Sequence, residues 1–255
     1  MQLYVGHDTF ALTKERTFTT LTLAPILKAL NQANRVNAKY TNADKEQASF
    51  WQGLQQSTSS NTSTPWTGYF SLGLGASAPI QVLVDIKTEG NETWPVLVKQ
   101  LQPLRDLGWL TRYENGKIIP GPVTIIGTGN TPINQLAAET GRDVFLDCPL
   151  GKLSGTAYVG PDGTEYKYNS TLCGIASSDF LNFSPEWKGV TDVPDGVRNN
   201  LTTAFDEAHA LGIKTRVWDT PEWPKYARYT INKLMLELGS DWLNCDDLGD
   251  VANNF

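Results

Sequence analysis

The sequence contains little histidine and cysteine, and it has no long apolar or basic run. Among its 255 residues are only two histidines and three cysteines. No segment reaches the roughly 18 consecutive apolar residues of a membrane-spanning helix, and the first residues lack a basic-then-apolar signal pattern. A formal net charge of −6 without a basic cluster argues against nucleic acid or an anionic membrane as the main partner. A small anionic ligand held by a local cation is still compatible with this composition.

The three cysteines do not have the spacing typical of a disulfide framework or a zinc site. Cys148, Cys173 and Cys245 are far apart and odd in number, and none belongs to a C-x-x-C pair. This pattern predicts small buried side chains rather than a disulfide framework or a zinc site. Five N-glycosylation sequons, which favour a secretory or vacuolar route, begin at Asn61, Asn91, Asn169, Asn182 and Asn200. The sequence says nothing more about the compartment.

A hydrophobic content of 40% in 255 residues suffices for one large core, so we expect a single domain over residues 1–255. A polar, low-complexity stretch predicts a loop insertion at about residues 35–78. Elsewhere strands alternate with helices, which indicates parallel pairing. One expected helix begins at Pro25, and the others cover 93–107 (kinked at Pro103), 194–211 and 224–238. A strand-like alternation at 1–5 opens the chain, and the six strands expected after it lie at 82–86, 123–126, 144–146, 172–180, 214–219 and 242–247.

Two charged side chains interrupt the apolar strand candidate QVLVDIKTEG at residues 81–90. Asp85 and Lys87 are two positions apart, so on a strand they point to the same side. Because burial of either charge alone is costly, they should either pair with each other as a buried structural ion pair or surround a ligand.

Polar residues also follow other strands, at the edge where parallel α/β folds bind ligands. They are His7-Asp8, Thr128, Asn130, Asp147, Trp218-Asp219, Asn244 and Asp246-Asp247. Carboxylates on one face suit Mg²⁺, or Ca²⁺, better than zinc, and a histidine beside such a cation can act as general acid or base. We therefore single out His7, whereas His209 is expected to be a packing or surface residue of a helix.

Some of these positions have simpler structural explanations. Asp246-Asp247 is expected to cap the turn that follows it, because Asp is favoured at helix starts. Trp218-Asp219 is equally explained as a loop anchor. The run Gly127-Thr128-Gly129 lacks the third glycine and the later acidic residue of a dinucleotide-binding fingerprint.

The chain resembles the fungal altered inheritance of mitochondria protein 6 family, within the PLC-like phosphodiesterase superfamily. The resemblance rests on LYVGHD, LVDIKTEG with the following TWP, PGPVTIIGTGN, RVWDTPEWP and DWLNCDDL, and it covers nearly the whole chain except about residues 35–75. It implies an α/β fold, a TIM-type (β/α)8 barrel related to glycerophosphodiester phosphodiesterases and to sphingomyelinase D. It also implies a Mg²⁺-dependent phosphoric diester hydrolase whose substrate is a small glycerophosphodiester or a lysophospholipid-type head group.

The resemblance also implies roles for individual residues. His7 matches the second of two acid–base histidines, Lys87 the lysine that steadies the phosphate, and Asp85 the later acidic ligand of Mg²⁺. Trp218 and Asp219 match a Trp-Asp pair that lines the substrate pocket in the sphingomyelinase-like branch, and Asn244 matches a further substrate-binding position.

The chain departs from the family pattern at its start. The first histidine and a Glu-x-Asp metal pair would lie upstream of the Gly-His-Asp turn, and about six strands are counted where a closed barrel needs eight. We therefore expect an N-terminally truncated barrel, with the first two strands missing, that is inactive as this fragment. The alternative is a non-catalytic, barrel-derived binding or scaffold protein.

A sugar-processing barrel is a third hypothesis. It would use Asp85 and Asp219 as its paired carboxylates. It gives no role to Lys87 or His7, which the phosphodiesterase hypothesis explains.

Overall fold

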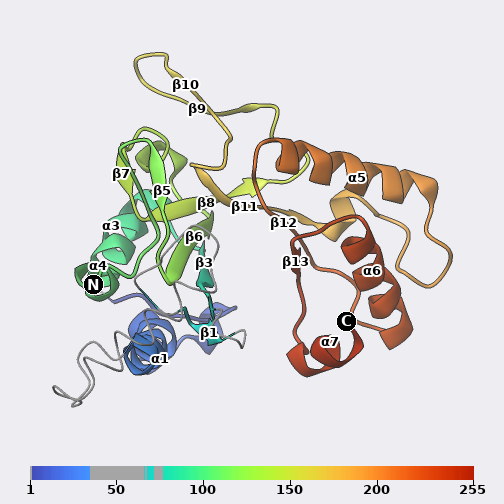
Figure 1. Cartoon of the computed structure of the whole chain (residues 1–255), viewed down its shortest axis with the longest axis horizontal. Helices are drawn as coiled ribbons and strands as arrows, with labels where there is room; N and C mark the ends of the chain where they lie inside the picture. Colours follow the sequence, from blue (N-terminus) through green and yellow to red (C-terminus); the bar gives the residue numbers. More distant parts are fainter. Residues whose placement is uncertain (1, 35–65, 67, 72–76) are drawn as a thin grey trace, which may run out of the picture. The chain divides into compact units, whose positions relative to one another are not determined.

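The computed structural model describes residues 2–34, 66, 68–71 and 77–255, so most of the predicted insertion at 35–78 lies outside the described residues. The chain forms two compact units (Figure 1). The first consists of Met1–Pro132 with Glu139–Val144, and the second of Ile133–Ala138 with Phe145–Phe255.

Two parallel strands form the centre of the first unit. Strand β3 (Ile80–Ile86) pairs with β6 (Val123–Gly129) along its whole length. Val123, Ile125 and Ile126 of β6 are fully buried, as expected for a β-branched run in a parallel sheet.

The helical segment after β3 is divided in two. Helix α3 (Gly90–Gln100) begins where the Glu89 carboxylate accepts a hydrogen bond from the Glu92 amide. Helix α4 (Gln102–Asp106) follows with Pro103 in its first turn, where a missing N–H costs little. Where a kink was predicted at Pro103, the structure has a break between two helices at Leu101.

The other elements of the first unit are short. They are η1 (Thr9–Ala11), the π-helical η2 (Thr19–Leu23), α1 (Ala24–Asn34), β1 (Phe70–Ser71), β2 (Ser77–Ala78), β4 (Arg112–Glu114), β5 (Lys117–Ile119) and β7 (Gly141–Arg142). The strand predicted over residues 1–5 is wrong, because only Tyr4 pairs, in an isolated bridge to Thr17. The β4–β5 hairpin turns at Asn115 and Gly116, which have φ values of 52° and 77° and form the Asn-Gly pair that tight hairpins favour.

The second unit contains four parallel strands, the first of which begins one residue earlier, at Val144 of the first unit. Strand β11 (Cys173–Asp179) pairs with β8 (Val144–Pro149) on one side and with β12 (Thr215–Trp218) on the other, and β12 also pairs with β13 (Trp242–Leu243). Helix α5 (Asp195–Ala210) contacts β12 and α6 (Lys225–Glu237) contacts β13 (Figure 1). The short helices η3 (Ile133–Gln135) and η4 (Phe180–Asn182) complete this unit with α7 (Leu248–Asn254).

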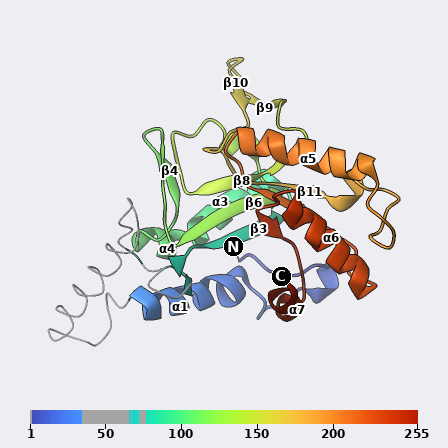
Figure 2. The ribbon, with the colours of Figure 1, turned by 45° about the vertical axis from the view of Figure 1, so that its right-hand side comes forward.

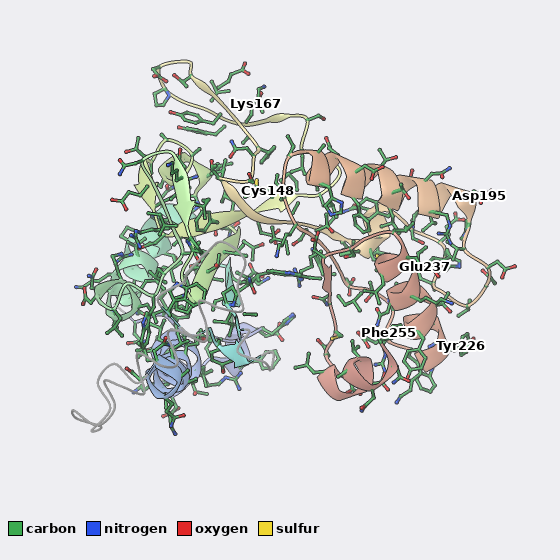
Figure 3. The ribbon with its side chains drawn as sticks, in the orientation of Figure 1. Cys148, Lys167, Asp195, Tyr226, Glu237 and Phe255 are labelled. Atoms are coloured by element: carbon green, nitrogen blue, oxygen red, sulfur yellow. A yellow bond between two sulfur atoms is a disulfide. The ribbon has the colours of Figure 1, made fainter. Side chains whose placement is uncertain are left out.

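The prediction that the cysteines form no disulfide is wrong. Cys148 of β8 and Cys173 of β11 are bonded, while Cys245 is free; Cys148 is labelled in Figure 3. The hairpin of β9 (Thr156–Val159) and β10 (Glu165–Lys167) lies between the two cysteines in the sequence and projects from the strands of this unit (Figure 2). Both cysteines are buried as expected, but on neighbouring strands, which brings their side chains together.

Two further predictions in this unit are confirmed. The Asp247 carboxylate accepts a hydrogen bond from the Asp250 amide and so caps α7. His209 is a half-exposed helix residue whose Nε2 donates to Asp241 Oδ2 at 2.9 Å. The amide and hydroxyl of Thr215 donate to the same oxygen, at 2.8 and 3.1 Å.

The Asp241 carboxylate predicts an acid-sensitive contribution to stability. Burial would raise the pKa of Asp241, but the hydrogen bonds from His209 and Thr215 outweigh burial and lower it. A lowered folded-state pKa means that Asp241 stabilises the fold above the unfolded value of about 3.9 and that this contribution is lost as pH falls through the folded value. We expect Asp241→Asn to lower the melting temperature at pH 7 and to flatten its decline below about pH 4.

The matched control is Asp206→Asn, which removes an exposed carboxylate on α5. It should leave both the melting temperature at pH 7 and its decline in acid unchanged. An Asp241→Asn variant with the wild-type pH profile would show that this carboxylate does not titrate with folding.

These strands and helices confirm the predicted fold class. Six parallel strands, the number expected from residue 82 onward, alternate with helices in the described residues. The protein is an α/β protein whose strands are consistent with part of a TIM-type barrel. Within the described residues, no helix combines the length and apolar character needed to cross a membrane.

Candidate functional site

Asp85 and Lys87 lie together at the carboxyl end of β3. Lys87 Nζ is 2.6 Å from Asp85 Oδ2, which confirms that the two side chains point to the same side. The side chains are 65% exposed for Lys87 and 44% exposed for Asp85, so the expectation of a buried pair is wrong. An exposed ion pair contributes only about 0–1 kcal/mol to folding. Stability alone therefore gives little reason for these charges at the strand end.

The loop that carries Lys87 is fixed to the end of β6. The Asn130 side-chain amide donates to the Thr88 carbonyl oxygen at 3.0 Å, and the Asn130 backbone amide donates to the Ile86 carbonyl oxygen at 2.8 Å. A β-carbon at Gly90 would lie 2.0 Å from the Asn130 carbonyl oxygen, so only glycine allows this approach. Asn130, a candidate ligand-binding residue from the sequence, thus holds the loop in place.

Gly129 is required by the geometry around Asp85. It has a φ of +63°, and a β-carbon there would lie 2.2 Å from Asp85 Oδ1 and 2.6 Å from the Ile86 carbonyl oxygen. We expect Gly129→Ala to lower the free energy of unfolding by about 1–3 kcal/mol from backbone strain alone, with a further loss from the contact. Urea unfolding measures the sum.

Gly116→Ala is the matched control for Gly129→Ala. Gly116 has a similar φ of +77°, but a β-carbon there meets nothing within 4 Å. The decrease in the free energy of unfolding of Gly116→Ala therefore measures backbone strain alone. The difference between the two variants measures the contact with Asp85 and β3. Equal losses would show that the end of β3 moves freely to accept a methyl group.

His7 lies in the predicted Gly-His-Asp turn. The turn follows a segment held by a hydrogen bond from the Val5 amide to the Arg16 carbonyl oxygen, 2.8 Å long. The His7 side chain is 94% exposed, and its Nδ1 is 3.6 Å from Asp8 Oδ2. No hydrogen bond or ion pair within the described residues joins His7 to Asp85 or Lys87, so the structure brings together only two of these three residues.

The substrate-binding candidates of the second unit lie at the ends of β12 and β13. Trp218 ends β12 and is 39% exposed. Asp219 follows with a φ of +56°, an uncommon conformation for a residue with a side chain. Asn244 follows β13, and its Oδ1 accepts hydrogen bonds from Arg216 Nε at 3.0 Å and Nη2 at 2.5 Å.

Arg216 is a neighbour of these candidates that the sequence analysis did not single out. It lies on β12 two positions before Trp218, so the period of a strand places both on one face. Burial lowers the pKa of Arg216, and the nearby Asp147 carboxylate opposes that shift. Asp147, Arg216 and Asn244 are therefore neighbours, although only the first and third were noted as polar strand ends.

The residues at Asp85 do not fit a complete site for Mg²⁺ or Ca²⁺. In the described ranges, no three side chains of His, Cys, Asp or Glu lie together as metal ligands would. Mg²⁺ keeps near-octahedral geometry and binds through charged oxygens. Asp85, which already pairs with Lys87, offers one such ligand.

The comparisons with known proteins all point to the same family. A family model described as "AIM6-like phosphodiesterase domain" matches residues 1–62 and 51–147. The chain is 31% identical over 260 residues to the altered inheritance of mitochondria protein 6 homolog of Arthroderma benhamiae, covering 99% of the chain and 70% of the relative. It is 31% identical over 271 residues to altered inheritance of mitochondria protein 6 of Saccharomyces cerevisiae S288c, covering 96% and 60%.

The relatives are longer than this chain. Altered inheritance of mitochondria protein 6 of Eremothecium gossypii is 29% identical over 195 residues, covering 71% of the chain but 48% of the relative. The chain thus spans between about half and 70% of the length of these three relatives. No solved structure matches it significantly.

Proposed function

Because the chain belongs to the AIM6-like phosphodiesterase domain family, we propose that it is a phosphoric diester hydrolase acting on glycerophosphodiester or lysophospholipid-type substrates. The observation that carries the proposal is the exposed Asp85–Lys87 pair at the end of β3. The pair is accessible to a ligand, its loop is fixed by Asn130, and its backbone requires Gly129. Such fixed geometry is expected of a site rather than of a solvated surface pair.

Each proposed role follows from the chemistry of the side chain. The Lys87 ammonium offsets the negative charge that develops on the phosphoryl oxygens. His7 protonates the leaving alcohol as a general acid. Trp218, Asp219 and Asn244 contact the substrate head group.

Mg²⁺ is the cofactor that we propose, with Asp85 as one of its ligands. When bound, the ion would polarise the phosphoryl group as a Lewis acid. Because the described residues contain no group of three potential metal ligands, we propose that the 255 residues alone bind Mg²⁺ too weakly for turnover.

The test compares hydrolysis of glycerophosphocholine and of lysophosphatidylcholine by the 255-residue chain and by the longest natural protein that contains it. We expect Mg²⁺-dependent turnover by the natural protein and none by the chain. Turnover by the chain itself would disprove its inactivity but keep the hydrolase assignment. Absence of turnover by the natural protein, with every diester and with added Mg²⁺ or Ca²⁺, would favour the non-catalytic binding protein instead.

A further inference from the structure

A buried hydroxyl group without a partner lies beside Arg216. Ser177 of β11 is 8% exposed, and its Oγ has no hydrogen-bond partner among the described residues. A buried hydroxyl left unbonded destabilises the folded protein. An alanine at this position would avoid that cost, so a bound ligand is a physical reason for serine here.

The register of the strands places a set of polar side chains on one face of the second unit. Ser177 pairs with Arg216, and Arg216 pairs with Trp242. Asp147 pairs with Ile175, two positions before Ser177. Partners in a parallel ladder and residues two apart on a strand point to the same side. Asp147, Ser177, Arg216 and Trp242 therefore share one face.

The hydrogen bonds of Arg216 orient the Asn244 side chain. Two guanidinium N–H groups donate to Asn244 Oδ1, so the Asn244 NH₂ group is turned away from Arg216. Arg216 retains three of its five donors. The cluster thus offers N–H donors from Arg216 and Asn244, and a hydroxyl group from Ser177 that both donates and accepts.

The charges of the cluster favour a ligand with hydroxyl groups over a free anion. Asp147 lies close enough to Arg216 to stabilise its charged form. A carboxylate on the same face as this guanidinium repels phosphate and so weakens its binding. Adjacent hydroxyl groups donate to the carboxylate and accept from the guanidinium and amide groups. Trp218, 39% exposed and two positions after Arg216, adds an apolar surface on the same face.

We propose that Ser177, Arg216 and Asn244, with Asp147, bind a polyhydroxylated head group, such as inositol, of the phosphodiester substrate. This inference rests on the proposed function and narrows it to one substrate class. It gives Ser177 and Arg216 a role that the family assignment does not include. A choline head group, which has a cation and no hydroxyl groups, would leave the same donors unused.

Binding tests the inference separately from turnover. Isothermal titration calorimetry of the 255-residue chain uses glycerophosphoinositol, glycerophosphocholine and inorganic phosphate as probes. We expect the inositol diester to bind at least about fivefold more tightly than the choline diester, since two or more extra hydrogen bonds at about 0.5–1.5 kcal/mol each are formed.

Ser177→Ala should weaken binding of the inositol diester by about two- to twelvefold, the loss of one hydrogen bond, and leave the choline diester unaffected. Its melting temperature should stay equal or rise, because an unbonded hydroxyl is removed; a purely structural serine would lower it. Ser178→Ala is the matched control, since Ser178 is the next residue on β11 and its Oγ accepts from Asn182 on the other face. It should not alter the preference. If Ser177→Ala does not fold, Asn244→Ala replaces it, with the same expected selective loss.

Equal affinities for the two diesters, or phosphate binding as tightly as the inositol diester, would overturn the inference. So would a chain that binds none of the three probes, or a Ser177→Ala variant with the wild-type preference. Hydrolysis of bis(4-nitrophenyl) phosphate by the natural protein, which requires no head group, reports on the proposed function alone. Such turnover together with equal affinities would support the proposed hydrolase function and contradict binding of a polyhydroxylated head group by Ser177, Arg216 and Asn244.

Discussion

Loss of the Cys148–Cys173 disulfide is expected to lower the free energy of unfolding by about 3 kcal/mol. The two cysteines are separated by 25 residues. In the chain-entropy model, closing a loop of this size removes enough freedom from the unfolded chain to account for that value. Both side chains are buried, at 2% and 4% exposure. The reduced thiols would therefore stay in the same apolar environment and form no new stabilising interaction.

Urea unfolding of wild type and of the Cys148→Ala/Cys173→Ala double variant measures this loss. The wild-type protein in dithiothreitol should become as unstable as the double variant once the bond is reduced. Cys245→Ala is the control, because Cys245 is free and should change neither the midpoint nor its response to dithiothreitol. Identical midpoints with and without the reductant, after the thiols are shown to be reduced, would contradict the expected loss.

The order of strands and helices was predictable because each element carries its own periodic pattern. β6 is a continuous β-branched run, and α5 has an apolar stripe of Val197, Leu201 and Phe205 that is buried in the structure. Local patterns of this kind depend on residues close in sequence. They fix which segments are strands and helices, and the alternation of the two implies parallel pairing.

The disulfide was not predictable, since it depends on residues far apart in sequence. Cys148 and Cys173 meet because β8 and β11 are neighbours. Between them lies the β9–β10 hairpin, which the sequence analysis did not predict. The spacing of the cysteines along the chain does not show that β8 and β11 are adjacent strands. The odd number of cysteines was therefore a misleading argument against a disulfide.

The candidate site also depends on contacts that the sequence alone does not reveal. The two-residue period of a strand correctly predicted that Asp85 and Lys87 share one side, but it could not predict that both are exposed. The same period could have identified Arg216, which precedes Trp218 by two positions. Ser177 had no comparable signal, because its unbonded hydroxyl group becomes visible only when its neighbours are known.

Replacing His7 with alanine is expected to lower the kcat of the natural protein for glycerophosphodiesters by about 10²–10⁴, the usual contribution of a general acid. The side chain is 94% exposed, so its removal should change the free energy of unfolding by no more than about 0.5 kcal/mol. A loss of turnover at unchanged stability would therefore reflect chemistry. His209→Gln is the control histidine, since it lies on α5 and bonds Asp241; its kcat should stay within about twofold of wild type.

Substrates with different leaving groups test whether His7 acts as a general acid. A glycerol or choline alcohol needs a proton as the P–O bond breaks, whereas 4-nitrophenolate leaves readily without one. We therefore expect His7→Ala to impair hydrolysis of glycerophosphocholine far more than that of bis(4-nitrophenyl) phosphate, and added imidazole to restore part of the former. If both substrates lose activity equally, His7 positions the substrate or the phosphate instead of protonating the alcohol. Lys87→Met should impair both substrates alike, because charge develops on the phosphoryl oxygens whichever group leaves.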